Sequence, residues 1–202
     1  FDLVKPHGWR TITLTEDIEF SLINIAQGRK LGWAVDAIVY DEQPTGFKQS
    51  WSQRSRWTVG HLQCMKEYTG KLINGVKEYK TLMNFDGALY LFGIPMMLLT
   101  FLLLGVNILL YMGAEMGVAE LMWNVGKFLF TTFLMPVVTG VAIMALEKKP
   151  IKPMFKAIVM YPVFMGSWIL INIKCLIKPN TKWEKIEHVR DINIQEVKSV
   201  TN

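Results

Sequence analysis

Cysteine and histidine are scarce in this chain, and their scarcity excludes two common ways of holding a small domain together. Only two cysteines, Cys64 and Cys175, and three histidines, His7, His61 and His188, occur among the 202 residues. The cysteines lie far apart and outside any paired motif, so the sequence predicts neither a disulfide framework nor a zinc site. The histidines show no ligand spacing, and each is expected to be a surface or packed residue rather than a metal ligand.

Charged side chains are also few, at 19% of the chain, and three long stretches lack them altogether. These uncharged stretches are residues 87–114, 128–146 and 157–173. A helix needs roughly 20 apolar residues to cross the hydrocarbon core of a bilayer, so the first stretch is long enough, the second is marginal and the third is short. With a mean hydropathy of +0.24, the chain is too apolar for an ordinary soluble domain.

The basic residues gather beside the apolar stretches rather than in one surface cluster. Because the net charge is +5, nucleic acid is a conceivable partner, but lysines next to apolar runs are more typical of contact with anionic lipid headgroups. We therefore expect membrane lipids and no nucleic acid as partners. The lysines concerned are Lys148, Lys149, Lys152, Lys156, Lys174, Lys178, Lys182 and Lys185.

The same pattern predicts a multi-pass protein of the cell membrane. We expect crossing helices within residues 88–112 and 116–146, joined to a cytosolic basic loop over residues 147–153. Residues 154–177 contain Pro162 and are expected either to cross or to lie at the interface or re-enter. The polar first third would then be cytosolic.

That polar third begins without an initiator methionine or an apolar leader, which is typical of an internal piece of a longer protein. Thr15, Glu16 and Asp17 are expected to start a helix, because Thr15 can cap it and two acids favour the positive end of the helix dipole. Thr13 and Glu16 also have the spacing of a capping box. Gly28 is expected to end this helix.

A strand and a second helix are expected next. Residues 33–40 are rich in aromatic and β-branched side chains, and residues 41–46 are a polar turn with Pro and Gly. Because one strand cannot make a sheet, the α/β layer that this order suggests would take its other strands from before Phe1. The pattern is helical again from Phe47, and residues 58–86 are typical of amphipathic helices lying along a membrane surface.

One group of side chains on this second helix suits a phosphorylated sugar. Gln53, Arg56 and Trp57 are spaced i, i+3, i+4 and share a face, while Arg54 lies on a neighbouring face. An arginine fork matches phosphate oxygens, a glutamine both donates to and accepts from hydroxyls, and an indole offers a flat surface to a sugar ring. An amphipathic helix with snorkelling arginines and an interfacial tryptophan would show the same pattern, so that alternative stays open.

Taken together, two of these runs resemble motifs of a known family. Thr15-Glu16-Asp17 resembles the T-E-D motif, and Gln53-Arg54-Ser55-Arg56-Trp57 the Q-(Q/R)-x-R-W motif, of membrane-embedded family 2 glycosyltransferases such as poly-N-acetylglucosamine, cellulose, chitin and hyaluronan synthases. The resemblance covers residues 8–63 and extends more loosely to Trp183-Glu184-Lys185, which is similar to a W-x-K element of such synthases.

The resemblance implies an α/β plus membrane α-helical fold. Residues 1–57 would be the C-terminal part of a cytosolic GT-A-like catalytic domain, and residues 58–86 would be interfacial helices. Transmembrane helices would follow over residues 87–177, and residues 178–202 would be a polar tail.

The resemblance also implies residue roles and a cofactor. Asp17 would be the general base that takes the proton of the acceptor hydroxyl, Trp57 would stack under the acceptor sugar, and Glu16 would be structural. Mg²⁺ or Mn²⁺ would be held mainly by D-x-D acids upstream of Phe1, and no metal ligand is assigned within this chain. The residues expected to bind substrate are Gln53, Arg54, Arg56 and Trp57.

The implied function is inverting transfer of a sugar, with N-acetylglucosamine as first choice, from a UDP-sugar to the hydroxyl end of a growing polysaccharide. Export of the polymer through the transmembrane helices would accompany synthesis. Two alternatives stay open: a non-processive membrane glycosyltransferase acting on a lipid or oligosaccharide, and a non-catalytic fragment or scaffold. An accessory subunit or an oligomer is compatible with either enzyme.

Overall fold

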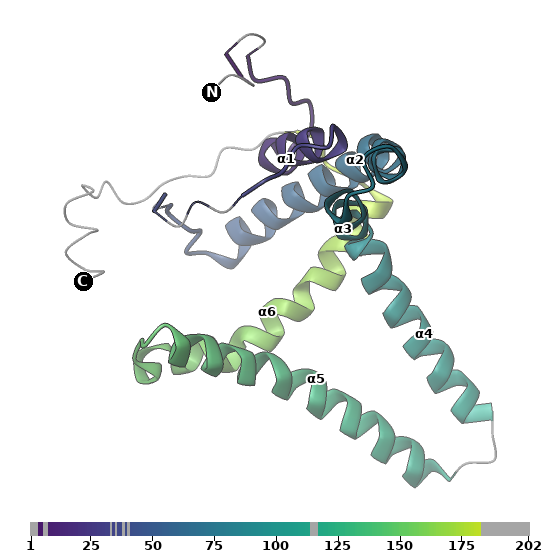
Figure 1. Ribbon diagram of the computed structural model, residues 1–202. Coiled ribbons are helices and arrows are strands. Elements are labelled where there is room, and N and C mark those ends of the chain that lie inside the picture. The colour runs from purple at the N-terminus through teal and green to yellow at the C-terminus, as the bar shows by residue number, and fades with distance from the viewer. Residues whose placement is uncertain are drawn as a thin grey trace. The chain divides into compact units, whose positions relative to one another are not determined.

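The structure, a computed structural model, describes residues 4–5, 8–32, 34, 36–37, 39, 41–113 and 117–182. Along these residues it contains six helices (Figure 1). The described residues fall into two compact units, one formed by those up to Leu91 together with residues 175–182, and the other by those within 92–174. The helices are α1 (Glu16–Ala26), α2 (Phe47–Tyr79), α3 (Leu82–Leu91), α4 (Gly93–Gly113), α5 (Val118–Leu146) and α6 (Ile151–Ile177).

Helix α1 starts where the sequence indicates, but the expected cap at its start is wrong. Thr15 is the residue before the helix, yet its side chain makes no capping hydrogen bond. The expected capping box is also absent, since the hydroxyl of Thr13 donates to the Thr15 carbonyl oxygen at 3.3 Å. Both threonine hydroxyls lie against the Cys64 sulfur of α2, at 3.5 and 3.6 Å. Tertiary contact has therefore replaced local capping.

The end of α1 follows the sequence closely. Gly28 adopts a positive φ of 75°, and its N–H donates to the Ile25 carbonyl oxygen at 2.9 Å, while the N–H of Arg29 donates to Asn24 at 3.0 Å. This pair of bonds is a Schellman motif, which gives hydrogen-bond donors to carbonyls that would otherwise be unsatisfied at the helix end. The predicted stop at Gly28 is confirmed.

The first unit is organised around α2, against which α1 and α3 both pack (Figure 1). Helix α2 is uninterrupted over its length and passes through the expected boundary between residues 57 and 58. Its apolar face and those of α1 and α3 form one core. The buried core residues are Leu22, Cys64, Tyr68, Leu72, Ala88 and Leu91.

The predicted strand is not found in the part of the chain that the structure describes. Residues 34, 36, 37 and 39 lie in a turn or irregular backbone, and the other positions of the segment 33–40 lie outside the described residues. No other described residue is in a strand either. A strand needs a neighbour to satisfy its backbone hydrogen bonds, and these residues offer it none. The α/β layer is thus not visible here, and the described fold is helical.

The first apolar stretch is divided between two helices, which corrects the expectation of one helix over residues 88–112. Helix α3 ends at Leu91 and α4 begins at Gly93. Pro95 explains the break, because proline has no N–H to bond the carbonyl four residues earlier and its ring clashes with that carbonyl. The Leu91 oxygen is instead 3.0 Å from Nε2 of His61 on α2. Since a carbonyl can only accept, His61 is the donor.

The second unit contains the apolar helices. By length and composition, segments of α4 (Gly93–Leu110), α5 (Val118–Leu146) and α6 (Ile151–Ile177) are each able to cross a membrane. None of the described residues of α5 is buried by protein, so an apolar helix surface far larger than soluble proteins tolerate is left uncovered. This supports association with a membrane. Pro162 does not interrupt α6, which is continuous around it.

Candidate functional site

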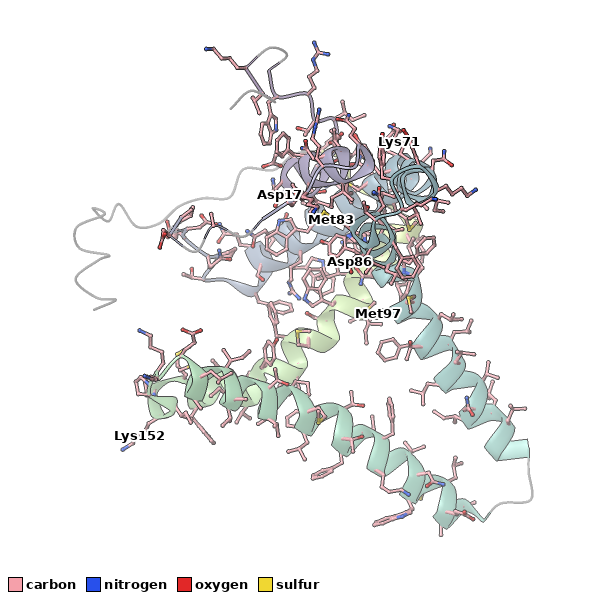
Figure 2. The ribbon with its side chains drawn as sticks, in the orientation of Figure 1. Asp17, Lys71, Met83, Asp86, Met97 and Lys152 are labelled. Atoms are coloured by element: carbon pink, nitrogen blue, oxygen red, sulfur yellow. The ribbon has the colours of Figure 1, made fainter. Side chains whose placement is uncertain are left out.

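The two acids of the T-E-D run lie in the first turn of α1, where the N-terminal end of the helix favours negative charge. Both Glu16 and Asp17 are exposed. The Asp17 carboxylate accepts one hydrogen bond, from the N–H of Ile18 at 2.8 Å. Figure 2 labels Asp17 on this helix. An exposed carboxylate with one local contact keeps lone pairs to accept a proton from a ligand.

A close contact between backbones sets where α1 begins on α2. A Cβ placed on Gly60 would lie 2.6 Å from the Thr15 side chain and 2.8 Å from its backbone nitrogen. Only glycine allows such an approach. One residue earlier, the N–H of Leu14 donates to Oε1 of Gln63 at 3.0 Å. Trp57 lies one helical turn before Gly60, so the start of α1 is docked beside the arginine–tryptophan run.

Glu19 is the residue of this region that sequence reasoning missed. Its side chain is 0% exposed. Oε2 accepts the N–H groups of Ile12 and Thr13 at 2.8 and 2.7 Å, and Oε1 accepts the hydroxyl of Tyr68 at 2.7 Å. Its position in the sequence could have indicated this burial. Glu19 lies three and four residues before Leu22 and Ile23, on the apolar face of α1, where a charged side chain is rare unless other groups bind it.

These contacts keep Glu19 ionised inside the unit. Burial raises the pKa of the Glu19 carboxyl, but the hydrogen bonds from Thr13, Tyr68 and Ile12 together outweigh burial and hold the pKa below its ordinary value. Burial and the bond to this carboxylate raise the pKa of Tyr68, which therefore stays protonated as a donor. Burial likewise raises the pKa of the neighbouring Cys64 thiol.

The four predicted substrate-binding residues of α2 differ in solvent exposure. Trp57 is 39% exposed, and Gln53 and Arg56 are partly buried. Arg54 is only 1% exposed. Its guanidinium carbon lies 5.6 Å from the centroid of the Phe47 ring.

Two contacts of Arg54 lie within its own helix. Its Nε donates to the carbonyl oxygen of Ser50, one turn earlier on α2, at 3.3 Å. Burial lowers the pKa of Arg54 from its ordinary value. The last turn of α6 lies nearby, where the thiol of Cys175 donates to the carbonyl oxygen of Ser55 at 3.6 Å.

An aromatic contact joins α2 to α3. Burial, and then the negative charge of Asp17, raises the pKa of the Tyr90 hydroxyl. The ring of Tyr90 meets the ring of His61 edge-on, with centroids 5.1 Å apart. Burial lowers the pKa of His61, and its bond to Leu91 opposes this effect. His61 of α2 and Tyr90 of α3 therefore pack together.

The described residues do not fit a divalent metal. No three His, Cys, Asp or Glu side chains among them converge on a common point. Glu19 is occupied by three donors, which leaves Glu16 and Asp17 as the exposed carboxylates of the first turn of α1. The W-x-K element, Trp183-Glu184-Lys185, lies outside the described residues.

The arrangement joins an exposed carboxylate, a half-exposed indole and a neighbouring guanidinium in one helical unit. This set can accept a proton, stack on a sugar ring and contact an anion. The family comparison agrees with that chemistry, since the model of glycosyl transferase family group 2 matches residues 2–146. The chain belongs to this family.

Two curated bacterial proteins are similar to the chain. The probable glycosyltransferase YdaM of Bacillus subtilis is 25% identical over 199 residues, which covers 91% of this chain and 45% of that protein. The uncharacterized glycosyltransferase YaiP of Escherichia coli is 28% identical over 65 residues, covering 32% of this chain and 16% of that protein. The chain thus spans less than half the length of these relatives. No solved structure gives a significant match.

Proposed function

We propose that the full-length protein is an inverting glycosyltransferase that moves a sugar from a UDP-sugar to the hydroxyl end of a growing polysaccharide. N-acetylglucosamine is the first candidate sugar, and the apolar helices would export the product. The observation that carries the proposal is the docking of Thr15 on Gly60, which sets the exposed Asp17 carboxylate beside the helix that bears Trp57. Membership of glycosyl transferase family group 2 supports transfer of a sugar from a nucleotide donor.

The chemistry needs a base at the position assigned to Asp17. The acceptor hydroxyl oxygen forms a bond to the anomeric carbon, while the bond from that carbon to the diphosphate oxygen breaks and its electron pair leaves with the nucleotide. Asp17 takes the hydroxyl proton, and a positioned base of this kind contributes typically about 10²–10⁴-fold. Its exposure and its one local hydrogen bond suit that task.

The residues of α2 would divide the binding between them. Trp57, the most exposed of the four, is assigned to the acceptor sugar ring, and Gln53 and Arg56 to hydroxyl and phosphate oxygens. Arg54 is assigned to stabilising the first turns of α2, because its buried guanidinium contacts Phe47 and Ser50 of the same helix.

Membrane export is the part of the proposal that rests on the second unit. Helices α4, α5 and α6 have the length and composition to cross a bilayer, and none of the described residues of α5 is fully buried by protein. Such helices could line a path for a polymer made at the membrane surface. A non-processive enzyme would not need that path, so the length of the product separates the two readings.

The test compares Asp17→Asn with Asp86→Asn in the full-length protein. Asp86 is an exposed acid of α3 in the same unit (Figure 2), so it controls for loss of one surface charge. Membranes carrying each variant are incubated with radiolabelled UDP-sugars, and the products are sized. We expect polymer from wild type and Asp86→Asn and none from Asp17→Asn.

Three results would change the conclusion. Normal transfer by Asp17→Asn would refute the base assignment. A single added sugar in the wild-type product would replace polymer synthesis with single transfer to a lipid or oligosaccharide. Wild-type membranes that use no UDP-sugar would leave a scaffold role.

A further inference from the structure

We propose that Glu19 is a positioning residue for Asp17: its buried carboxylate joins the loop before α1 to α2 and so sets where the base stands. This inference rests on the proposed function of Asp17. Glu19 itself is fully enclosed and touches no solvent, so it acts through the backbone rather than on a substrate.

The first step of the argument is geometric. Asp17 lies between two anchored points, Thr15, which contacts position 60 of α2, and Glu19. From Glu19, Oε2 reaches back over the start of the helix to the N–H groups of Ile12 and Thr13, at 2.8 and 2.7 Å. The chain from residue 12 to residue 19 is therefore closed into a loop that carries Asp17 at its outer side.

The second step concerns what else could hold this loop. The Thr15 side chain does not cap α1, so the usual local device that fixes the start of a helix is missing. Glu19 is the group of α1 that binds the preceding backbone. Its other oxygen, Oε1, accepts the hydroxyl of Tyr68 at 2.7 Å. One carboxylate thus ties the loop, α1 and α2 together.

The third step is energetic. A buried carboxylate without a cation is costly, and it is tolerated only when its oxygens are satisfied by donors. All three donors here come from the loop and from α2, so a movement of either element would leave buried charge unsatisfied. The titratable groups nearby on α2 are Tyr68 and Cys64, and burial helps to keep both neutral at pH 7 because it raises the pKa of each. The arrangement therefore resists displacement of the start of α1.

The experiment uses Glu19→Gln in the full-length enzyme, with Leu22→Val as the matched control. Leu22 is buried on the same helix and belongs to the core, so its shortening weakens packing without changing the contacts of the loop. Gln keeps the size of the side chain but loses one of the two equivalent acceptor oxygens and the charge. For each variant we measure kcat, KM for the UDP-sugar, and Tm in detergent.

We expect Glu19→Gln to lower kcat by about 10–100-fold with little change in the donor KM, because displacing a catalytic group by about 1 Å can lower the rate by that factor. Leu22→Val should lower Tm while kcat stays within about twofold of wild type. Tyr68→Phe, which keeps the carboxylate and its two backbone bonds, should lower kcat less than Glu19→Gln. It also serves as the deciding variant if Glu19→Gln does not fold.

Each contrary outcome has a defined meaning. If Glu19→Gln keeps wild-type kcat while Asp17→Asn is inactive, the positioning role is wrong and the proposed function stands. If the loss of kcat for a given loss of Tm is the same in Glu19→Gln as in Leu22→Val, Glu19 is only a stabilising residue and the inference fails. If Asp17→Asn is active, the proposed function fails first and the inference with it. Wild-type kcat in Tyr68→Phe, where Glu19→Gln does not fold, also overturns the inference.

Discussion

The contact between Thr15 and Gly60 makes a sharp prediction about a single methyl group. In Gly60→Ala the new Cβ would lie 2.6 Å from the Thr15 side chain, whereas ordinary contact begins at 3.4 Å. The start of α1 must therefore move away from α2 by about 0.8 Å, the difference between these distances. Backbone as well as side-chain atoms of Thr15 are involved, so a change of rotamer does not relieve the overlap.

A second glycine of the same helix provides the control. Gly70 is also in α2, and a Cβ there would meet nothing within 4 Å. Replacing a helical glycine by alanine stabilises by roughly 0.5–1 kcal/mol wherever there is room, and both variants gain this amount. Forcing a methyl into a filled site costs about 1–3 kcal/mol. The difference in stability between Gly60→Ala and Gly70→Ala is therefore the overlap alone, about 1–3 kcal/mol.

The assay measures both Tm in detergent and sugar transfer by the full-length protein. We expect Gly70→Ala to be at least as stable as wild type and fully active. Gly60→Ala should have the lower Tm and should lose about 10–100-fold in kcat, since it displaces Asp17 by most of 1 Å. Equal Tm and equal kcat for the two variants would refute the claim that the Thr15–Gly60 approach places the base.

Three further predictions follow from the buried polar groups. The pKa of Glu19 is lowered in the folded state, so its stabilising effect is present above the unfolded pKa of about 4.3 and is lost as pH falls through the folded pKa. The difference in Tm between wild type and Glu19→Gln should therefore shrink on acidification. A difference in Tm that stays constant with pH would contradict this. His61→Leu leaves the Leu91 carbonyl without its donor and should lower the free energy of unfolding by about 1–3 kcal/mol. Adding Pro95→Ala, which gives residue 95 an N–H that can bond the Leu91 carbonyl, should recover part of this stability in a double-mutant cycle. Strict additivity of the two changes would argue that they do not act on the same carbonyl. The Cys64 thiol, 0% exposed and with its pKa raised by burial, should react with a maleimide only after unfolding, as followed by mass spectrometry, and rapid labelling of the native protein would refute its burial.

Much of the helical structure follows from local sequence. The spacing of apolar residues and Gly28 predict α1, and its Schellman end is a property of six consecutive residues. The continuous helix from Phe47 and the long uncharged stretches are equally local signals. They are readable because hydrophobic period, glycine stops and the length needed to cross a bilayer depend on neighbours in the chain.

Other features depended on residues distant in sequence. The sequence predicted capping by Thr15, yet its hydroxyl lies against Cys64, a residue 49 positions later. It predicted one crossing helix through residue 92. Pro95 is a local signal for the break there, but the sequence does not show that His61 donates to the Leu91 carbonyl. The strand of residues 33–40 was predicted from composition, which does not supply the neighbouring strand that a ladder requires.

The sequence by itself determined which residue types are available to the site: an acid at the start of α1, an arginine–tryptophan run on α2, and apolar helices after them. Only the tertiary structure decided how they are used. It buried Arg54, left Trp57 half exposed, and placed Glu19 in the interior with three donors from two other segments. The physical reason is that burial and hydrogen-bond satisfaction are set by groups far apart in the chain, whereas helix period and hydropathy are set by near neighbours.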